Sequence, residues 1–190
     1  MRVTGGEFAG RLIQAPKGPA IRPTLDHVRQ ALFNLVGARI TGAKVLDLFA
    51  GSGALGIEAL SRGAAHATFV DRSFFCAQAI EANLQSLGCQ VDPTPFTLIR
   101  AEVLTAIRRF KRETQLFDLI LLDPPYGKHL ARKSLNALGD YAIVGQLGLV
   151  VAETDKRDSL PEQIRGKEAK LFLQRSVRYG DTALSFYSRQ

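Results

Sequence analysis

The chain has 190 residues, 46% of them hydrophobic and 23% charged, which is enough apolar material for one domain with a buried core. Lysine and arginine number 25 against 18 acidic residues, and this formal charge of +7 is typical of a nucleic-acid-binding protein as much as of a merely basic surface. No apolar run approaches the roughly 18 residues of a membrane span and the first residues lack the apolar segment of a signal peptide, so a cytoplasmic location and no membrane partner are expected.

Residues 1–40 differ in character from the rest and are predicted to form a small extension on a main domain of residues 41–190. Glycines and alternating apolar residues in GGEFAGRLIQAP, at 5–16, are typical of a β-hairpin.

The second part of this extension begins extended at Arg22-Pro23 and then predicts a helix over 24–36. Thr24 is the expected N-cap, and the apolar residues of the helix share one face. A surface position without an assigned role is expected for Arg29.

Apolar runs then alternate with helical patterns along the main domain. Strands are predicted at 44–50, 66–71, 96–100, 117–123 and 148–154, and helices at 52–63, 73–88, 101–112 and 129–140. Two last runs, 169–177 and 183–189, predict a hairpin that turns at Tyr179-Gly180-Asp181. This order predicts a parallel α/β sheet covered on both faces, with ligands beyond the carboxyl ends of its strands.

A glycine loop follows the first predicted strand. DLFAGSGALG contains Gly51-x-Gly53-x-x-Gly56 and opens a helix, which is the spacing of a nucleotide-binding fingerprint. Glycines let the backbone approach a ligand, and the helix N-terminus favours an anion. Asp71 ends the second predicted strand, where a carboxylate can accept both hydroxyls of a ribose.

Two further residues of this loop indicate which nucleoside cofactor is bound. Asp47 and Phe49 precede Gly51, where dinucleotide enzymes usually have apolar residues and glycines. D-x-F-x-G-x-G resembles the first motif of the class I S-adenosylmethionine-dependent methyltransferases. The predicted cofactor is therefore S-adenosyl-L-methionine, with S-adenosyl-L-homocysteine as its product.

The fourth predicted strand ends at Asp123-Pro124-Pro125-Tyr126. An exocyclic amine on a base is a poor nucleophile because its lone pair is delocalised into the ring. Asp123 and the carbonyl of Pro124 can each accept one N–H of such an amine, while the prolines hold these acceptors in place. Tyr126 offers a ring face on which the base can stack. DPPY resembles the [DN]-P-P-[YF] motif of amino-methyltransferases.

Two other methylation chemistries fit the sequence less well. Methylation of a pyrimidine C5 needs a cysteine near this corner, whereas Cys76 and Cys89 lie on and just after the second helix of the main domain. Metal-assisted O-methylation needs a cluster of ligands, and the three histidines are scattered, so no metal site is predicted.

Four stretches together resemble one family. GG-x-x-x-GR-L-x-x-P near the N-terminus, RPT-x-D-x-VR-x-ALFN at 22–34, the glycine loop and DPPY are similar to the bacterial 16S rRNA (guanine-966-N2)-methyltransferases. The resemblance covers nearly the whole chain. It implies a Rossmann-like class I methyltransferase fold, an α/β fold with a seven-stranded mostly parallel sheet, helices on both faces and a small N-terminal β-hairpin extension.

The resemblance also implies the site residues and partners. The cofactor would be bound by Asp47, Phe49, Gly51, Gly53, Asp71, Arg72 and Glu102, and the guanine by Asp123, Pro124, Pro125 and Tyr126. RNA would be contacted by the extension, through Arg2, Arg11, Lys17, Arg22 and Thr24. The partner would be 16S rRNA in an assembled or partly assembled 30S subunit, and the enzyme a monomer.

Several alternatives stay open at this stage. Glu102 is an adenine contact or simply an acid at a helix start, and RRFKR at 108–112 is an RNA-binding patch or a solvated helix end. DNA adenine or cytosine methyltransferases use the same DPPY chemistry, although about forty residues leave little room for their target-recognition domain. Protein-glutamine methyltransferases typically have Asn at the position of Asp123. A binding protein that has lost catalysis, or a nicotinamide oxidoreductase, leaves DPPY without a role.

Overall fold

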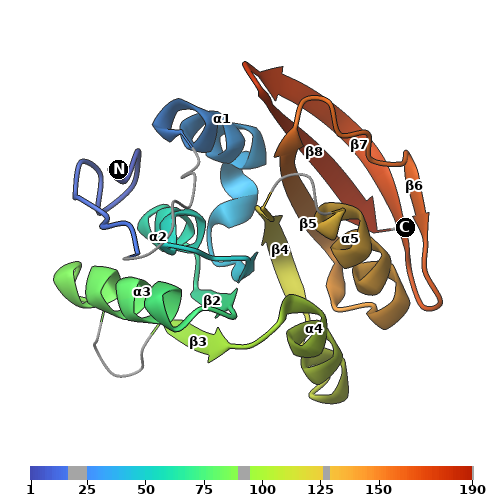
Figure 1. The fold of residues 1–190 in the computed structure, drawn as a ribbon, viewed down its shortest axis with the longest axis horizontal. Helices are drawn as coiled ribbons and strands as arrows, with labels where there is room; N and C mark the ends of the chain where they lie inside the picture. Colours follow the sequence, from blue (N-terminus) through green and yellow to red (C-terminus); the bar gives the residue numbers. More distant parts are fainter. Residues whose placement is uncertain (17–24, 90–94, 126–128, 190) are drawn as a thin grey trace. The chain divides into compact units, whose positions relative to one another are not determined.

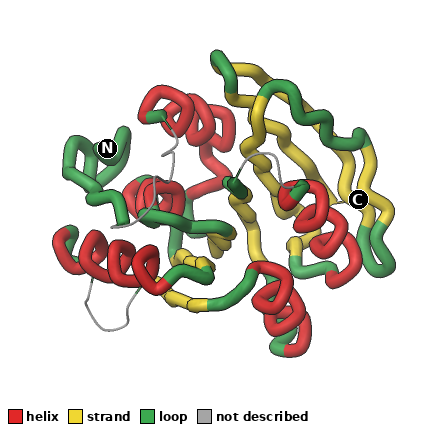
Figure 2. The backbone as a smooth tube through the Cα atoms, viewed as in Figure 1, coloured by secondary structure: helices red, strands yellow, loops and turns green. Residues whose placement is uncertain are grey.

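The computed structural model describes residues 1–16, 25–89, 95–125 and 129–189. They form two compact units, Met1–Ala101 and Glu102–Gln190. Figure 2 shows helices and strands in both units, with a group of long strands near the C-terminus. None of the helices among these residues is long and apolar enough to cross a membrane.

The first unit contains three parallel strands in the order β3-β2-β1 (Figure 1). The strands are β1 (Lys44–Leu48), β2 (His66–Asp71) and β3 (Phe96–Arg100). Helices α2 (Ala54–Ser61) and α3 (Phe74–Ser86) pack against them, and α1 (Asp26–Val36) with the 3₁₀ turn η1 (Gly37–Ile40) precedes β1. Because the strands are parallel, the loop after β1 and Asp71 at the end of β2 lie at the same edge.

The second unit continues the alternation and ends in antiparallel strands. Its elements are α4 (Val103–Arg112), β4 (Phe117–Leu122), α5 (Leu130–Tyr141), β5 (Val144–Asp155), β6 (Gln163–Arg165), β7 (Lys170–Tyr179) and β8 (Thr182–Arg189). The strand order is β4-β5-β8-β7-β6, with β4 and β5 parallel and the other pairs antiparallel. The carboxyl end of β4 therefore lies next to that of β5.

All seven predicted strands are present, and β6 makes an eighth among the described residues. The hairpin turn is where it was expected, with Gly180 at a φ of +59° between β7 and β8. The predicted cap of α3 is also confirmed, because the Ser73 hydroxyl accepts a hydrogen bond from the N–H of Cys76. Strand β6 has three residues and only one apolar side chain, Ile164, so the sequence is too short there to predict a strand.

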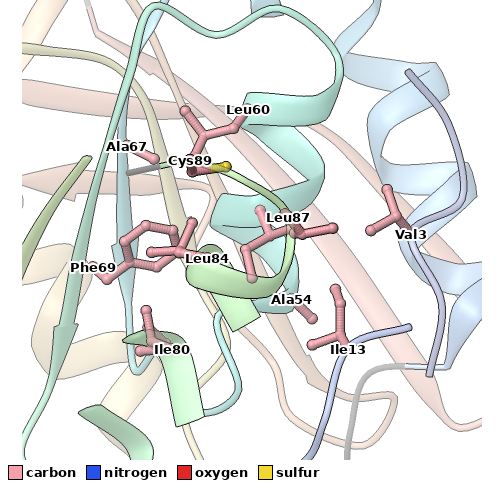
Figure 3. Packing of buried hydrophobic residues seen from close by; sticks show 12 residues of the cluster. Val3, Ile13, Ala54, Leu60, Ala67, Phe69, Ile80, Leu84, Leu87 and Cys89 are labelled. Carbon is pink, nitrogen blue, oxygen red and sulfur yellow. The ribbon is translucent and has the colours of Figure 1, made fainter. Parts of the chain in front are cut away.

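The N-terminal segment, residues 1–16, is called the arm here. Its predicted hairpin is reduced to one antiparallel bridge, Arg2 with Leu12, so the pairing starts at residue 1 and residues 5–10 form the turn. Val3 and Ile13 of the arm enter the same buried cluster as Ala54 of α2 and Leu84 of α3 (Figure 3). The arm therefore belongs to the core of the first unit.

Arg29 is not on the surface, and that expectation was wrong. Its side chain is 0% exposed and its Nε donates to Glu58 Oε2 at 3.2 Å, while Glu58 is also 0% exposed. The same guanidinium donates to Asp26 and to the backbone carbonyl of Arg2. Glu58 accepts further hydrogen bonds from Arg62 and from the backbone and hydroxyl of Thr4. The pattern of the helix predicts that Arg29 is exposed to solvent. Its guanidinium is buried because α2 supplies the opposite charge of Glu58.

Substitution Arg29→Met should lower the free energy of unfolding by about 3 kcal/mol, because it leaves the buried Glu58 carboxylate without one of its two cations. Arg100→Met is the matched control in the same unit. Arg100 is exposed and its guanidinium lies 5.7 Å from the Phe74 ring centroid, a contact worth no more than about 1 kcal/mol. Denaturant unfolding measures both, and equal small losses would contradict the role given to Arg29.

Candidate functional site

The loop between β1 and α2 has the backbone conformation of a ligand-binding loop. Gly51 and Gly53 have φ values of +57° and +80°, which favour glycine, and Gly53 caps α2. Phe49 has a φ of +65°, an uncommon and strained value for an aromatic residue. Strain of this kind is typical of functional loops, which agrees with the prediction that this loop binds a ligand.

The Asp71 carboxylate holds this loop. Its Oδ2 accepts a hydrogen bond from the N–H of Gly51 at 2.9 Å, and its Oδ1 accepts one from the N–H of Ser73 at 2.8 Å. Each carboxylate oxygen has a second lone pair, and the residue is partly exposed. Asp71 is therefore oriented by the backbone and can still accept the two hydroxyls of a ribose, so these residues fit a nucleoside cofactor.

Asp47 fixes the other side of the loop. Its side chain is buried, and its Oδ2 accepts a hydrogen bond from the N–H of Gly56 at 2.9 Å. Gly56 itself is needed for close packing, because a Cβ at this position would lie 2.2 Å from the Phe69 ring. Direct contact of Asp47 with the cofactor stays a prediction.

The second predicted motif follows β4 in the second unit. The strand ends at Leu122, which pairs with Ala152 of β5, and Asp123 comes next with partial exposure. Pro124 is buried and Pro125 is exposed, so the corner is anchored on one side and open on the other. Tyr126 lies outside the described residues. A carboxylate on a proline-stiffened corner can accept a hydrogen bond from a substrate amine.

Of the predicted RNA contacts, Arg2 and Arg11 are described and both are exposed. Arg2 Nη1 donates to the carbonyl of Gly10 at 2.9 Å, and Arg11 Nη2 donates to the carbonyl of Ser86 at 2.6 Å. Both side chains are thus positioned by the protein backbone. Lys17, Arg22 and Thr24 lie outside the described residues.

The remaining predicted positions follow β2 and lie in and around α4. Arg72 is exposed directly after Asp71. Glu102 is also exposed, and its backbone carbonyl accepts the N–H groups of Thr105 and Ala106 at the start of α4. In the 108–112 cluster, Arg109 forms an ion pair with Glu113, and Lys111 forms one with Glu168. Exposed pairs of this kind are typical of a solvated helix end.

The cysteines do not provide a nucleophile for this site. Cys76 and Cys89 are buried, and burial raises the pKa of both thiols, so each stays protonated near neutral pH. Within the described ranges, no group of three His, Cys, Asp or Glu side chains is arranged to hold a metal ion.

Two polar residues near the predicted motifs carried no signal in the sequence. Asn83 of α3 is buried and its Nδ2 donates to the carbonyl of Ser52, inside the glycine loop, at 2.9 Å. Glu153 of β5 is 3% exposed and follows Ala152, the partner of Leu122, so it lies at the same sheet edge as Asp123. Asparagine and glutamate are ordinary in such elements, and only the tertiary pairing distinguishes them.

Comparison with known proteins gives consistent matches over the whole chain. The family model described as conserved hypothetical protein 95 matches residues 1–188. The chain is 38% identical to "Putative rRNA methyltransferase YlbH" of Bacillus subtilis, over 100% of both chains. It is 32% identical to "Ribosomal RNA small subunit methyltransferase D" of Escherichia coli, over 100% of this chain and 90% of the other.

A solved structure agrees with these matches. "Putative methyltransferase yhhF from Escherichia coli" superposes with a TM-score of 0.80 at 30% identity, covering 100% of this chain and 98% of the other. The α/β Rossmann-like methyltransferase fold is thereby confirmed.

Substitution Gly56→Ala should destabilise the protein by about 1–3 kcal/mol, because the new methyl group would overlap the buried Phe69 ring. Phe69→Leu replaces the ring by a smaller side chain and by itself leaves a small cavity. If the overlap is the cause, the double variant should lose less stability than the sum of the two single variants in denaturant unfolding. Strictly additive losses would contradict this explanation.

Proposed function

Since the chain belongs to the conserved hypothetical protein 95 family, we propose that it is an S-adenosylmethionine-dependent methyltransferase that modifies small-subunit (16S) ribosomal RNA. The acceptor is the exocyclic N2 of a guanine. The observation that carries the proposal is the Asp123-Pro124-Pro125 corner directly after the buried strand β4. The printed names of the relatives from Bacillus subtilis and Escherichia coli support the choice of ribosomal RNA.

The glycine loop and Asp71 hold the cofactor in this proposal. S-adenosylmethionine supplies a methyl group on a sulfonium. Asp71, oriented by the N–H groups of Gly51 and Ser73, accepts the ribose hydroxyls. The left-handed backbone at Gly51 and Gly53 allows close approach of the ligand, and Asp47 keeps the loop in register with α2 through Gly56. Phe49, Arg72 and Glu102 are proposed as further contacts.

The corner prepares the guanine amine for methylation. The Asp123 carboxylate accepts one N–H of the amine and the Pro124 carbonyl accepts the other, which favours a more tetrahedral nitrogen with an available lone pair. Tyr126 stacks on the base. Asp123 need not be a strong base, because the methylated amine is acidic enough to lose its proton easily.

The RNA lies against the extension in this proposal. Arg2, Arg11 and Lys17 contact its phosphates, and Arg22 and Thr24 contact it as well. An extension of about forty residues has few base-reading elements, so recognition depends on RNA shape and on an unpaired base. The substrate is therefore an assembled or partly assembled small subunit, which is consistent with the expected cytoplasmic location, and the enzyme acts as a monomer.

Incubation with labelled S-adenosylmethionine and unmodified small ribosomal subunits should give N2-methylguanine at one site, identified by nucleoside mass analysis. Free 16S transcript should react more slowly, because only the folded particle fixes the RNA shape that a small protein can recognise. Equal rates on both would contradict the particle preference. Label on DNA or on protein glutamine, with the RNA unlabelled, would overturn the substrate.

Substitution Asp123→Ala should lower methyl transfer about a hundred-fold or more, since it removes one of two acceptors from the amine. Affinity for S-adenosylhomocysteine should change little, because Asp123 is not among the residues that hold the cofactor in this proposal. Asp123→Asn is the matched control, whose amide oxygen still accepts a hydrogen bond and should retain more activity. A near-normal rate in Asp123→Ala would refute the role of the corner.

A further inference from the structure

Asn83 joins the arm to the glycine loop inside the first unit. It lies on α3 with 2% exposure, and its Oδ1 accepts the backbone N–H of Gln14 at 2.9 Å. Its Nδ2 donates to the carbonyl of Gln14 at 3.0 Å and to the carbonyl of Ser52 at 2.9 Å. One buried amide therefore satisfies both backbone groups of an arm residue and one carbonyl of the loop.

Ser52 stands between the two glycines that have left-handed backbone. Gly51 donates to Asp71 on one side of it and Gly53 caps α2 on the other. The Ser52 hydroxyl also donates to the Met1 sulfur at 3.6 Å, which is a second point where the arm meets the loop. When residues 51–53 become more rigid or more mobile, Asn83 and the arm are affected through direct contacts.

Among the described residues, the other hydrogen bonds that hold the arm involve residues outside 51–53. Glu58 and Ser61 of α2 bind Thr4, Gly5 and Phe8, all within the first half of the arm. Val3 and Ile13 pack in the apolar cluster, where Figure 3 shows Ile13 close to Ala54. Apolar packing is non-directional, so it does not report the state of the loop. Asn83 is different, because its hydrogen bonds need the loop and Gln14 in one geometry.

We propose that Asn83 is a positioning residue that couples the glycine loop to the arm, so that occupancy of the loop by the cofactor orders the arm for RNA. This inference rests on the proposed function for the identity of both ligands. The coupling is reciprocal, and RNA held by the arm strengthens cofactor binding by the same factor.

The physical cause is shared conformational entropy. A cofactor that fixes residues 51–53 also fixes the Ser52 carbonyl, and with it the donor side of Asn83. Part of the conformational entropy that Gln14 must lose is then already lost when the cofactor binds. Cofactor binding and RNA binding are therefore positively coupled without a large structural change. A buried amide that loses one partner leaves an unsatisfied polar group, so the two ends cannot relax independently.

Hydrogen–deuterium exchange with and without S-adenosylhomocysteine tests the coupling in the full chain. The ligand should slow exchange at 51–53, and it should slow exchange of the Gln14 amide by about five-fold or more. In Asn83→Asp, an isosteric change that removes both donated hydrogen bonds, the loop should still be protected but the arm should not.

Ser61→Ala is the matched control. Ser61 also anchors the arm with two hydrogen bonds, to Gly5 and Phe8, but does not touch the loop, so ligand-dependent protection of Gln14 should persist. Protection at 51–53 without protection at Gln14 in the unsubstituted protein would overturn the inference and leave the cofactor assignment intact. No protection at either place would overturn both. Protection of Gln14 that survives in Asn83→Asp would show that the link runs elsewhere.

Discussion

The hydrogen bond from the Gly51 N–H to the Asp71 carboxylate is the constraint on which the first unit depends. It joins the loop after β1 to the end of β2, although the two residues are twenty positions apart in the sequence. Without it, glycines with left-handed φ would have many other conformations available, since glycine loses more backbone entropy on folding than other residues. The carboxylate thus fixes the loop and keeps lone pairs for the ribose hydroxyls that we propose it accepts.

Other buried polar side chains near the loop also hold backbone groups in place by hydrogen bonds. Asp47 binds the Gly56 N–H, Glu58 binds Thr4, Arg29 and Arg62, and Asn83 binds Gln14 and Ser52. Such groups cost free energy when they are buried, so they stabilise one arrangement only while every partner stays in place. The arm adds Val3 and Ile13 to the apolar core, and these directional contacts fix its register there.

The features that were predicted from the sequence are those with local causes. Strand runs, the Ser73 cap, the Gly180 turn and the glycine loop each depend on residues within a few positions of one another. The missed features depend on distant partners. Arg29 reads as a surface cation until Glu58, 29 positions later, is placed beside it. Asn83 has no pattern that points to Gln14, 69 positions earlier. The position of the arm likewise depends on its contacts with α2 and α3, which are distant in the sequence.

In the proposed function, the arginines of the arm bind RNA with few residues. Arg2 and Arg11 each donate to a backbone carbonyl, of Gly10 and Ser86, while remaining exposed. A guanidinium has five N–H donors, so one used for positioning leaves others for phosphate oxygens. Because the side chain is already held, less rotamer entropy is lost on binding than with a free lysine. On this proposal, a fixed arm that carries fixed cations gains RNA affinity from preorganisation, and the gain grows as the arm becomes better ordered.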